Sequence, residues 1–192
     1  MGKIKYQKQI KEFIKKTPVF SIKDLKKIIP NDYAKLLLHN LVKKDEVIRI
    51  TKGYYSRFED PILIAYCIKP SYIGLENALS LHNLWEQETN VTLLTPRKIR
   101  QGTRKVQGNN VIIKKIKPNH FFGFEYLDYN TLKIPVSDIE KTFIDLVYFN
   151  KYLDKELIKE MKKQIKKKKL NKYLDNYDKN FKDKIKTKLS LN

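Results

Sequence analysis

One short segment carries side chains of the types that contact a nucleic-acid duplex. Tyr33, Leu36, Asn40 and Lys43 recur at spacings of three and four residues, which puts them on one face of a predicted helix over residues 32–44. Asparagine can pair with adenine through two hydrogen bonds, and a leucine methyl can pack against a thymine methyl. Tyrosine hydroxyls and lysine ammonium groups can reach phosphates. The face therefore predicts contact with bases and with the DNA backbone.

Further polar side chains surround this face. Asp32 and His39 lie beside it on the same predicted helix, and Arg49 and Lys52 lie on a hairpin predicted to follow. We interpret His39 as a border residue, because no Cys or second His lies at metal-ligand spacing. The complete predicted DNA-contact set is Lys23, Lys26, Lys27, Asp32, Tyr33, Lys35, Leu36, His39, Asn40, Lys43, Arg49 and Lys52.

The two residues at the centre of this set also have simpler interpretations. Leu36 can contact a second subunit, or it can be an exposed leucine without a role. Asn40 can be a solvated polar side chain. Contact with DNA and these two alternatives all stay open on the sequence.

Helical periodicity predicts the elements that would position these side chains. Residues 3–16 form a predicted amphipathic helix, residues 22–28 a short second helix begun by Ser21, and residues 32–44 a third helix capped by Asn31. The face of the third helix expected to pack on the first two consists of Ala34, Leu37, Leu38 and Leu41.

A hairpin is predicted after the three helices. Residues 47–50 and 54–56 form the strands, and the turn over residues 51–53 contains Gly53, which can adopt the positive φ that such a turn requires. Helix, short helix, helix and hairpin is the element order of a winged helix-turn-helix, so residues 1–58 are predicted to be that DNA-binding domain. Because winged domains also contact proteins, a protein-binding role stays open for this segment.

Composition favours a polyanionic partner. The chain has 192 residues and a formal charge of +20, and its charge is concentrated at the two ends: residues 1–60 carry +8 and residues 151–192 carry +9. Nucleic acid is the commonest partner of so basic a chain. The lone Cys67 excludes a disulfide framework, and no apolar stretch approaches a membrane span. We therefore expect a cytoplasmic protein without membrane contact.

A second basic surface is predicted in the middle of the chain. Three of the five arginines lie within residues 97–104, where the flanking Gly102 and Gly108 favour a flexible loop. Guanidinium groups bind phosphate through two hydrogen bonds, so the loop can bind flanking DNA or RNA; the alternative is a solvated hairpin edge. The predicted surface consists of Arg97, Lys98, Arg100, Arg104 and Lys105.

The middle of the chain, residues 59–150, is predicted to be an α+β domain with an antiparallel sheet and helices on one face. The predicted helices cover residues 61–68, 75–84 and 138–149, the last capped by Ser137 with Glu140 completing a capping box. We interpret Asp138, Glu140 and Asp145 as capping and surface charges. The predicted strands cover residues 91–94, 103–106, 111–116, 121–127 and 131–134.

The last segment, residues 151–192, is predicted to be a lysine-rich helical extension. Apolar residues at helical spacing predict two amphipathic helices that break near Lys169. Their apolar stripe must cover the middle domain or the same segment of a second subunit. The run Lys162–Lys169 is a solvated face or a strip that follows phosphates.

Several segments resemble the AbiEi antitoxin family. The sequence of residues 72–84 is similar to the family's signature helix, and residues 91–98 to the strand and basic turn that follow. Residues 122–125 and 134–146 resemble later segments of the family, and residues 52–55 its N-terminal hairpin. The resemblance covers about residues 5–150, and the lysine-rich extension departs from it.

This resemblance implies a repressor and an antitoxin. Family members bind operator DNA through an N-terminal winged helix and repress their own operon. Their C-terminal domain counteracts a nucleotidyltransferase toxin without forming a stable complex, in type IV systems that act against phage by abortive infection. An inverted-repeat operator would suit a monomer bound in pairs or a homodimer. The alternative is a winged-helix regulator, or an adaptor that binds RNA or protein, with no toxin partner.

Catalytic motifs are not found in the sequence. It contains no phosphate-binding Gly-rich loop, no His-Glu-x-x-His and no Gly-x-Ser-x-Gly, and His39, His82 and His120 are dispersed. A nucleotidyltransferase would need a Gly-Ser turn, and Gly-Ser does not occur. We therefore expect a protein that is not an enzyme and that needs no metal or cofactor.

Overall fold

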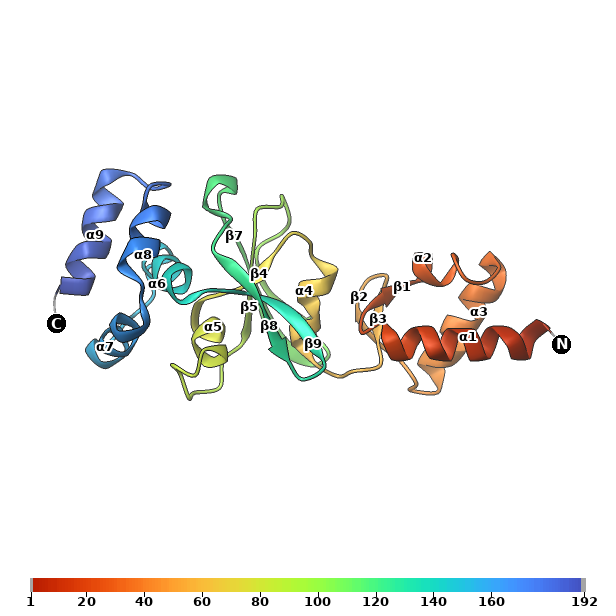
Figure 1. Ribbon diagram of the computed structural model, residues 1–192. Helices are drawn as coiled ribbons and strands as arrows, with labels where there is room; N and C mark the ends of the chain where they lie inside the picture. The colour runs from red at the N-terminus through yellow and green to blue at the C-terminus, as the bar shows by residue number, and fades with distance from the viewer. Residues whose placement is uncertain (1, 191–192) are drawn as a thin grey trace. The chain divides into compact units, whose positions relative to one another are not determined.

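The computed structural model describes residues 2–190, with side chains described from residue 6 onward. The chain divides into two compact units (Figure 1). The first holds the residues up to Lys69 together with Lys105–Asn110, and the second holds Pro70–Arg104 with the residues from Val111 onward. The C-terminal helices belong to the second unit, which also holds most of the residues of the larger sheet.

The first unit combines short helices with a three-stranded sheet of order β1-β3-β2. Its elements are α1 (Gly2–Lys16), β1 (Phe20–Ser21), α2 (Ile22–Leu25), α3 (Asn31–Lys43), β2 (Ile48–Thr51), β3 (Tyr54–Ser56), the 3-10 helix η1 (Pro61–Leu63) and α4 (Ile64–Cys67). Both contacts of β3, with β1 and with β2, are antiparallel.

The predicted buried face of α3 is confirmed. Ala34, Leu37, Leu38 and Leu41 are all buried, and they share a core with apolar residues of α1, β1 and α2. Burial of each leucine contributes about 1.5–3 kcal/mol, which explains why the periodic apolar positions of α3 face inward. The opposite face of the helix is consequently turned to solvent.

Three details of the first unit differ from the sequence prediction. The second helix ends at Leu25, because the segment that follows forms turns. Asn31 is the first residue of α3 and does not cap it; Pro30 occupies the cap position and has no side-chain acceptor. The structure adds the strand β1 between α1 and α2, and β1 pairs with Tyr54 and Tyr55 of β3.

The larger sheet has six strands in the order β6-β7-β5-β4-β9-β8. The antiparallel sheet that was predicted is a mixed sheet: β4–β5 and β8–β9 are antiparallel, whereas β5 runs parallel to β7 and β4 runs parallel to β9. Every residue of β5 is buried, as is typical of a strand covered on both faces. The strands are β4 (Tyr72–Ile73), β5 (Val91–Thr95), β6 (Gly102–Val106), β7 (Asn109–Lys115), β8 (Phe124–Tyr129) and β9 (Leu132–Ser137).

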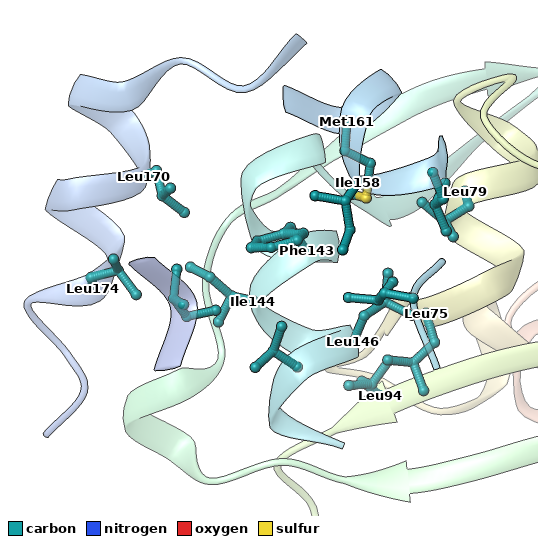
Figure 2. Close-up of a cluster of buried hydrophobic side chains, with 14 of the residues drawn as sticks. Leu75, Leu79, Leu94, Phe143, Ile144, Leu146, Ile158, Met161, Leu170 and Leu174 are labelled. Carbon is teal, nitrogen blue, oxygen red and sulfur yellow. The ribbon is translucent and has the colours of Figure 1, made fainter. Parts of the chain in front are cut away.

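The helices of the second unit share one core (Figure 2). Leu170 and Leu174 of α8 face Ile144 of α6, and Ile158 and Met161 of α7 lie beside α6. The apolar stripe of the C-terminal segment therefore covers the middle of the chain. The helices are α5 (Leu75–Leu81), the 3-10 helix η2 (Pro118–His120), α6 (Ile139–Tyr148), α7 (Lys155–Gln164), α8 (Lys167–Leu174) and α9 (Lys179–Ser190).

The C-terminal segment contains three helices where two were predicted. The first break falls at Ile165–Lys166, before the predicted break at Lys169, and a second break separates α8 from α9. Ile165 is extended, with φ −66° and ψ 123°, so it turns the chain between α7 and α8. Among residues 2–190, no helix is both long and apolar enough to cross a bilayer.

Candidate nucleic-acid interface

The outward face of α3 carries most of the predicted contacts. Leu36 is 55% exposed, and it is one of four large apolar side chains described as exposed. A leucine that is exposed to water at the centre of a polar helix face does not contribute the free energy that its burial would supply. The other exposed members of the set on this helix are Asp32, Lys35, His39, Asn40 and Lys43.

Tyr33 differs from its neighbours because it is half-buried. Its ring centroid lies 5.8 Å from that of Tyr6 on α1. Tyr33 and Asn40 both line a hollow of about 130 Å³ between α1 and α3. The ring of Tyr33 thus packs α3 against α1, while Asn40 lies at the edge of the hollow with its amide in solvent.

The hairpin β2–β3 presents two more of the predicted contacts. Its turn consists of Lys52 and Gly53, and the φ of +84° at Gly53 is one that residues with a Cβ rarely adopt. Lys52 is exposed at the tip. Arg49 is also exposed, and its Nε donates a hydrogen bond to the carbonyl of Thr51 at 3.3 Å, which holds the side chain along β2.

A short hydrogen-bonded turn positions the lysines in and just after α2. The backbone N–H and the hydroxyl of Ser21 both donate to Oδ2 of Asp24, at 2.9 Å and 2.7 Å. Burial opposes ionisation of Asp24, but the hydrogen bonds from Ser21 and the charge of Lys27 hold the pKa of its carboxyl below the usual value. The exposed lysines of this segment are Lys23, Lys26 and Lys27.

The candidate set as a whole is cationic. Seven of its side chains are Lys or Arg and only Asp32 is acidic, and all seven basic side chains are exposed. A concentration of one charge sign on one surface attracts a polyanion from solution and binds it by releasing counterions. Lys27 lies 3.5 Å from Asp24, but both groups are solvated, and such a pair contributes little.

The structure places only some residues of the second predicted basic surface together in one exposed loop. Arg97, Lys98 and Arg100 are exposed in the loop between β5 and β6. Arg104 is half-buried, and its guanidinium donates to the carbonyl of Arg100 at 2.6 Å, so part of its hydrogen-bonding capacity serves the loop itself. Lys105 belongs to the first unit, where its ammonium group donates to the carbonyl of Gly108 at 3.3 Å.

The second unit contains a buried polar cluster that was predicted only in part. Asp138 is a capping residue, as predicted, but Asp138, Glu140 and Asp145 are not surface charges, because they are only 5%, 3% and 0% exposed. Lys141 is also fully buried, and its ammonium group is paired with Oδ1 of Asp145. The hydroxyl of Tyr72 donates to the other oxygen of Asp145 at 2.8 Å. The cluster therefore joins β4 to α6 inside the core.

One signal in the sequence could have revealed this burial. Apolar side chains cover more than half of the circumference of α6 and leave a narrow polar strip that contains Lys141 and Asp145, and a helix with so wide an apolar face is largely buried. Its charged residues must then find partners in the interior. Burial raises the pKa of Asp145 and lowers that of Lys141, while their mutual attraction opposes both shifts.

The C-terminal segment is held to α6 by the same cluster. The ammonium group of Lys169 lies 3.1 Å from Oδ2 of Asp138 and 3.1 Å from Oε2 of Glu140. The hydroxyl of Tyr173 donates to Asp138 at 2.7 Å, and the backbone N–H of Lys166 donates to Glu140 at 2.7 Å. Two residues at the start of α6 and three residues at or within α8 thus form one contact between segments that are far apart in the sequence.

The start of α6 also corrects the predicted cap. Asp138 is the N-cap residue, because its Oδ1 accepts from the backbone N–H of Lys141 at 2.8 Å. Ser137 is buried in β9, where its hydroxyl lies 2.7 Å from that of Thr142. Glu140 reaches the C-terminal segment and does not complete a capping box.

Acid should weaken the contact made by Glu140. Burial opposes ionisation, but hydrogen bonds from Lys166 and Lys169 hold the pKa of Glu140 below its ordinary value of 4.5. A carboxyl with a lowered pKa stabilises the fold above its unfolded pKa and loses that contribution as pH falls below it. Glu140→Gln should therefore destabilise the protein most between about pH 6 and 7 and progressively less below about pH 4.5.

Urea unfolding across this pH range, followed by the fluorescence of Trp85, measures the effect. Trp85 is the only tryptophan and packs against the core of the second unit. Glu88→Gln removes the same charge at an exposed position and should leave the unfolding free energy almost unchanged. A difference between Glu140→Gln and the parent protein that stayed constant with pH would contradict the role of ionised Glu140.

The polar cluster has the character of a structural element. The carboxylates of Asp138, Glu140 and Asp145 all accept hydrogen bonds or ion pairs from within the protein. Within the described part of the chain, no group of three or more His, Cys, Asp and Glu residues is arranged to hold a metal ion. Cys67 is buried, and burial raises the pKa of its thiol to about 12, which disfavours the thiolate.

Comparison with known proteins gives a likeness of fold. No protein-family model matches the chain, and no curated protein matches it. Among solved structures, the chain is similar to the protein in one crystal structure, with a TM-score of 0.62 over 91% of this chain and 72% of the other. That protein is Rv2827c from Mycobacterium tuberculosis, and 11% of the aligned residues are identical. At this identity the likeness concerns the fold alone.

Proposed function

We propose that the chain is a DNA-binding transcriptional repressor in which residues 1–58 form a winged helix-turn-helix. The observation that carries the proposal is Leu36, which is 55% exposed at the centre of the α3 face. A thymine methyl would bury this leucine, and Asn40 beside it would read adenine. The basic residues around them would bind phosphates and set the register of α3 in the major groove.

The arrangement of the elements supports this assignment. α3 follows a tight turn after α2, and β2 and β3 form a hairpin with an exposed lysine at its tip. In winged helix-turn-helix proteins these positions belong to the recognition helix and to the wing that lies along the DNA backbone. Two such domains on an inverted repeat would contact half-sites about one helical turn, or roughly 34 Å, apart.

We further propose that the chain acts in the cytoplasm as an AbiEi-like antitoxin. It would repress its own operon, and its second unit would counteract a nucleotidyltransferase toxin without a stable complex. The support is the sequence resemblance of residues 72–84, 91–98, 122–125 and 134–146, which lie on β4, α5, β5, β8, β9 and α6. Co-expression with a nucleotidyltransferase encoded beside the gene tests this role, and rescue of growth is the expected result.

Salt dependence of DNA binding tests the proposed DNA-binding function. The full chain is titrated onto a labelled fragment of its own promoter at 50–200 mM salt, and the dissociation constant is measured by fluorescence anisotropy. Each phosphate neutralised should contribute about 0.9 to the slope of log affinity against log salt. Lys52→Ala should lower that slope by about one. Equal affinity for the promoter and for a scrambled duplex would contradict the proposal, because a repressor typically prefers its operator by about 10³-fold or more.

A second candidate is a winged-helix regulator or an adaptor for RNA or protein, with no toxin partner. The observation that favours it is the exposed group Arg97, Lys98 and Arg100, which lies on the second unit. Guanidinium groups in a loop can bind phosphates of RNA as well as of DNA. Failure to neutralise any neighbouring toxin, together with RNA binding that Arg97→Ala and Arg100→Ala abolish, would favour this candidate.

A further inference from the structure

The helices of the C-terminal segment enclose a groove that the proposed function does not use. Residues of α7, α8 and α9, with Ile165 between α7 and α8, line a volume of about 310 Å³, which we call the tail groove. Its floor is formed by the buried side chains of Leu170, Leu174 and Ile185. Ile165 and Leu189 form its half-exposed walls. The groove thus offers aliphatic surface and no aromatic ring.

The rim of the tail groove is cationic. Its charged lining residues are Lys162, Lys167 and Lys186, and no carboxylate lines it. All three lysines are exposed. An apolar cleft bordered by a single sign of charge favours a ligand that is apolar on one side and oppositely charged on its edges.

The lysine run does not form one continuous surface. Lys169 is committed to Asp138 and Glu140, and Lys163 lies 2.6 Å from Glu160. Lys162 and Lys167 lie on either side of the break at Ile165 and border the groove. The two lysines therefore border the groove from both sides of the break, beside its aliphatic side chains.

These features distinguish between two kinds of acidic partner. Sequence-tolerant binding of single-stranded nucleic acid uses aromatic side chains and arginines, on which bases stack. The lining of the tail groove contains neither. An amphipathic protein segment would use both features, because its aliphatic side chains would fill the groove and its carboxylates would meet the lysines.

We propose that the tail groove docks an acidic amphipathic segment of a partner protein. Its volume lies at the lower end of the range of about 300–1,000 Å³ for ligand pockets, so it would hold a few aliphatic side chains. The lysines would speed association and orient the segment, and burial of Ile165 and Leu189 would supply most of the affinity. The site lies on α7–α9 and is independent of DNA binding by α3.

A synthetic peptide tests the docking site. The probe is a fluorescein-labelled helical peptide of about 15 residues with leucines on one face and glutamates on the other, titrated with the full chain in an anisotropy assay. We expect saturable binding that Lys167→Glu combined with Lys186→Glu weakens at least tenfold, or about 1.4 kcal/mol. The matched control, Lys168→Glu with Lys179→Glu, makes the same charge change outside the groove and should alter affinity less than about twofold.

A second variant tests the aliphatic wall. Leu189→Ala should weaken peptide binding about three- to tenfold while leaving the unfolding transition of Trp85 in place, because Leu189 is already half-exposed. The proposal is overturned if the peptide does not bind saturably, or if both lysine pairs reduce binding equally. It is also overturned if an unlabelled single-stranded oligonucleotide of equal charge displaces the peptide from the parent protein and from both lysine-pair variants alike. If the protein that carries Lys167→Glu and Lys186→Glu still binds the operator, peptide docking and DNA binding are separate functions. Either proposal can then fail without the other.

Discussion

Replacement of Leu36 and Asn40 by alanine should lower operator affinity by roughly 100-fold or more. Each base contact of this kind discriminates by about 1–3 kcal/mol, and the two side chains are separate enough on α3 to contact different bases. The fold should survive, because both side chains are exposed and the apolar face of α3 is untouched. Fluorescence anisotropy with the operator and with a scrambled duplex measures the loss, which should fall mainly on the specific complex.

The neighbouring Val42 provides the matched control. It is 37% exposed on the same helix and lies outside the predicted contact set, so Val42→Ala should leave operator affinity within about twofold. Unchanged operator affinity in the double variant would remove Leu36 and Asn40 from the interface. If instead the variant changed its oligomeric state in gel filtration without a specific loss of DNA affinity, Leu36 would be a subunit contact.

Asp145→Leu alone should be among the most destabilising single changes in the second unit. It leaves the ammonium group of Lys141 buried without its partner, and breaking a buried pair in this way costs about 3–5 kcal/mol. For a domain of this size the midpoint of thermal unfolding should fall by roughly 6–20 °C. The hydroxyl of Tyr72 also loses its acceptor, which adds to the effect.

The double replacement Lys141→Met with Asp145→Leu should recover most of this loss. Both charges then disappear from the core, and the new side chains are apolar and of similar volume, so the double variant should unfold within about 2 kcal/mol of the parent protein. Unfolding in urea, followed by the fluorescence of Trp85, measures the free energies in the unit that contains the pair.

An exposed ion pair on α7 serves as the control for the Lys141 and Asp145 variants. Lys163 and Glu160 lie 2.6 Å apart with side chains that are 60% and 48% exposed, so removing both should change stability by less than about 1 kcal/mol. Equal unfolding energies for Asp145→Leu and for the double variant would mean that Lys141 tolerates burial alone. The ion pair would then not be what holds α6 in place.

The contrast between these pairs also shows how the second unit is assembled. The exposed pair joins neighbouring turns of one helix, whereas the acceptors of the buried cluster are contacted from β4 and α8. Loss of the buried contacts should therefore loosen α8 from α6 as well as destabilise the core. The cooperative unfolding of Trp85 is expected to report both events together.

The sequence by itself determined the longer elements of the first unit. α1, α3 and the hairpin follow from spacing that repeats within a few residues, and the inward face of α3 follows from the same spacing. The exposed position of Leu36 was also predictable, because a residue two places from a buried position lies on another side of the helix. Local periodicity is enough to predict an element and its inward face where that element buries only one face.

Local sequence patterns predicted the larger sheet less completely. Five strands were predicted within a few residues of their positions, but β4 has only two residues, which is too short for any alternation to appear. That strand lies between β5 and β9 and pairs parallel with β9. Its place depends on hydrogen bonds to distant strands, which no local pattern records.

Only the tertiary structure decided which charges lie inside. Asp138, Glu140 and Asp145 look like ordinary helix-start and surface residues in the sequence, and their partners are contributed by segments remote in the chain. The same holds for the lysine run, which the fold divides between an ion-pair contact and the rim of the tail groove. A buried charge is tolerated where partners converge on it, and that convergence is a property of the packed chain.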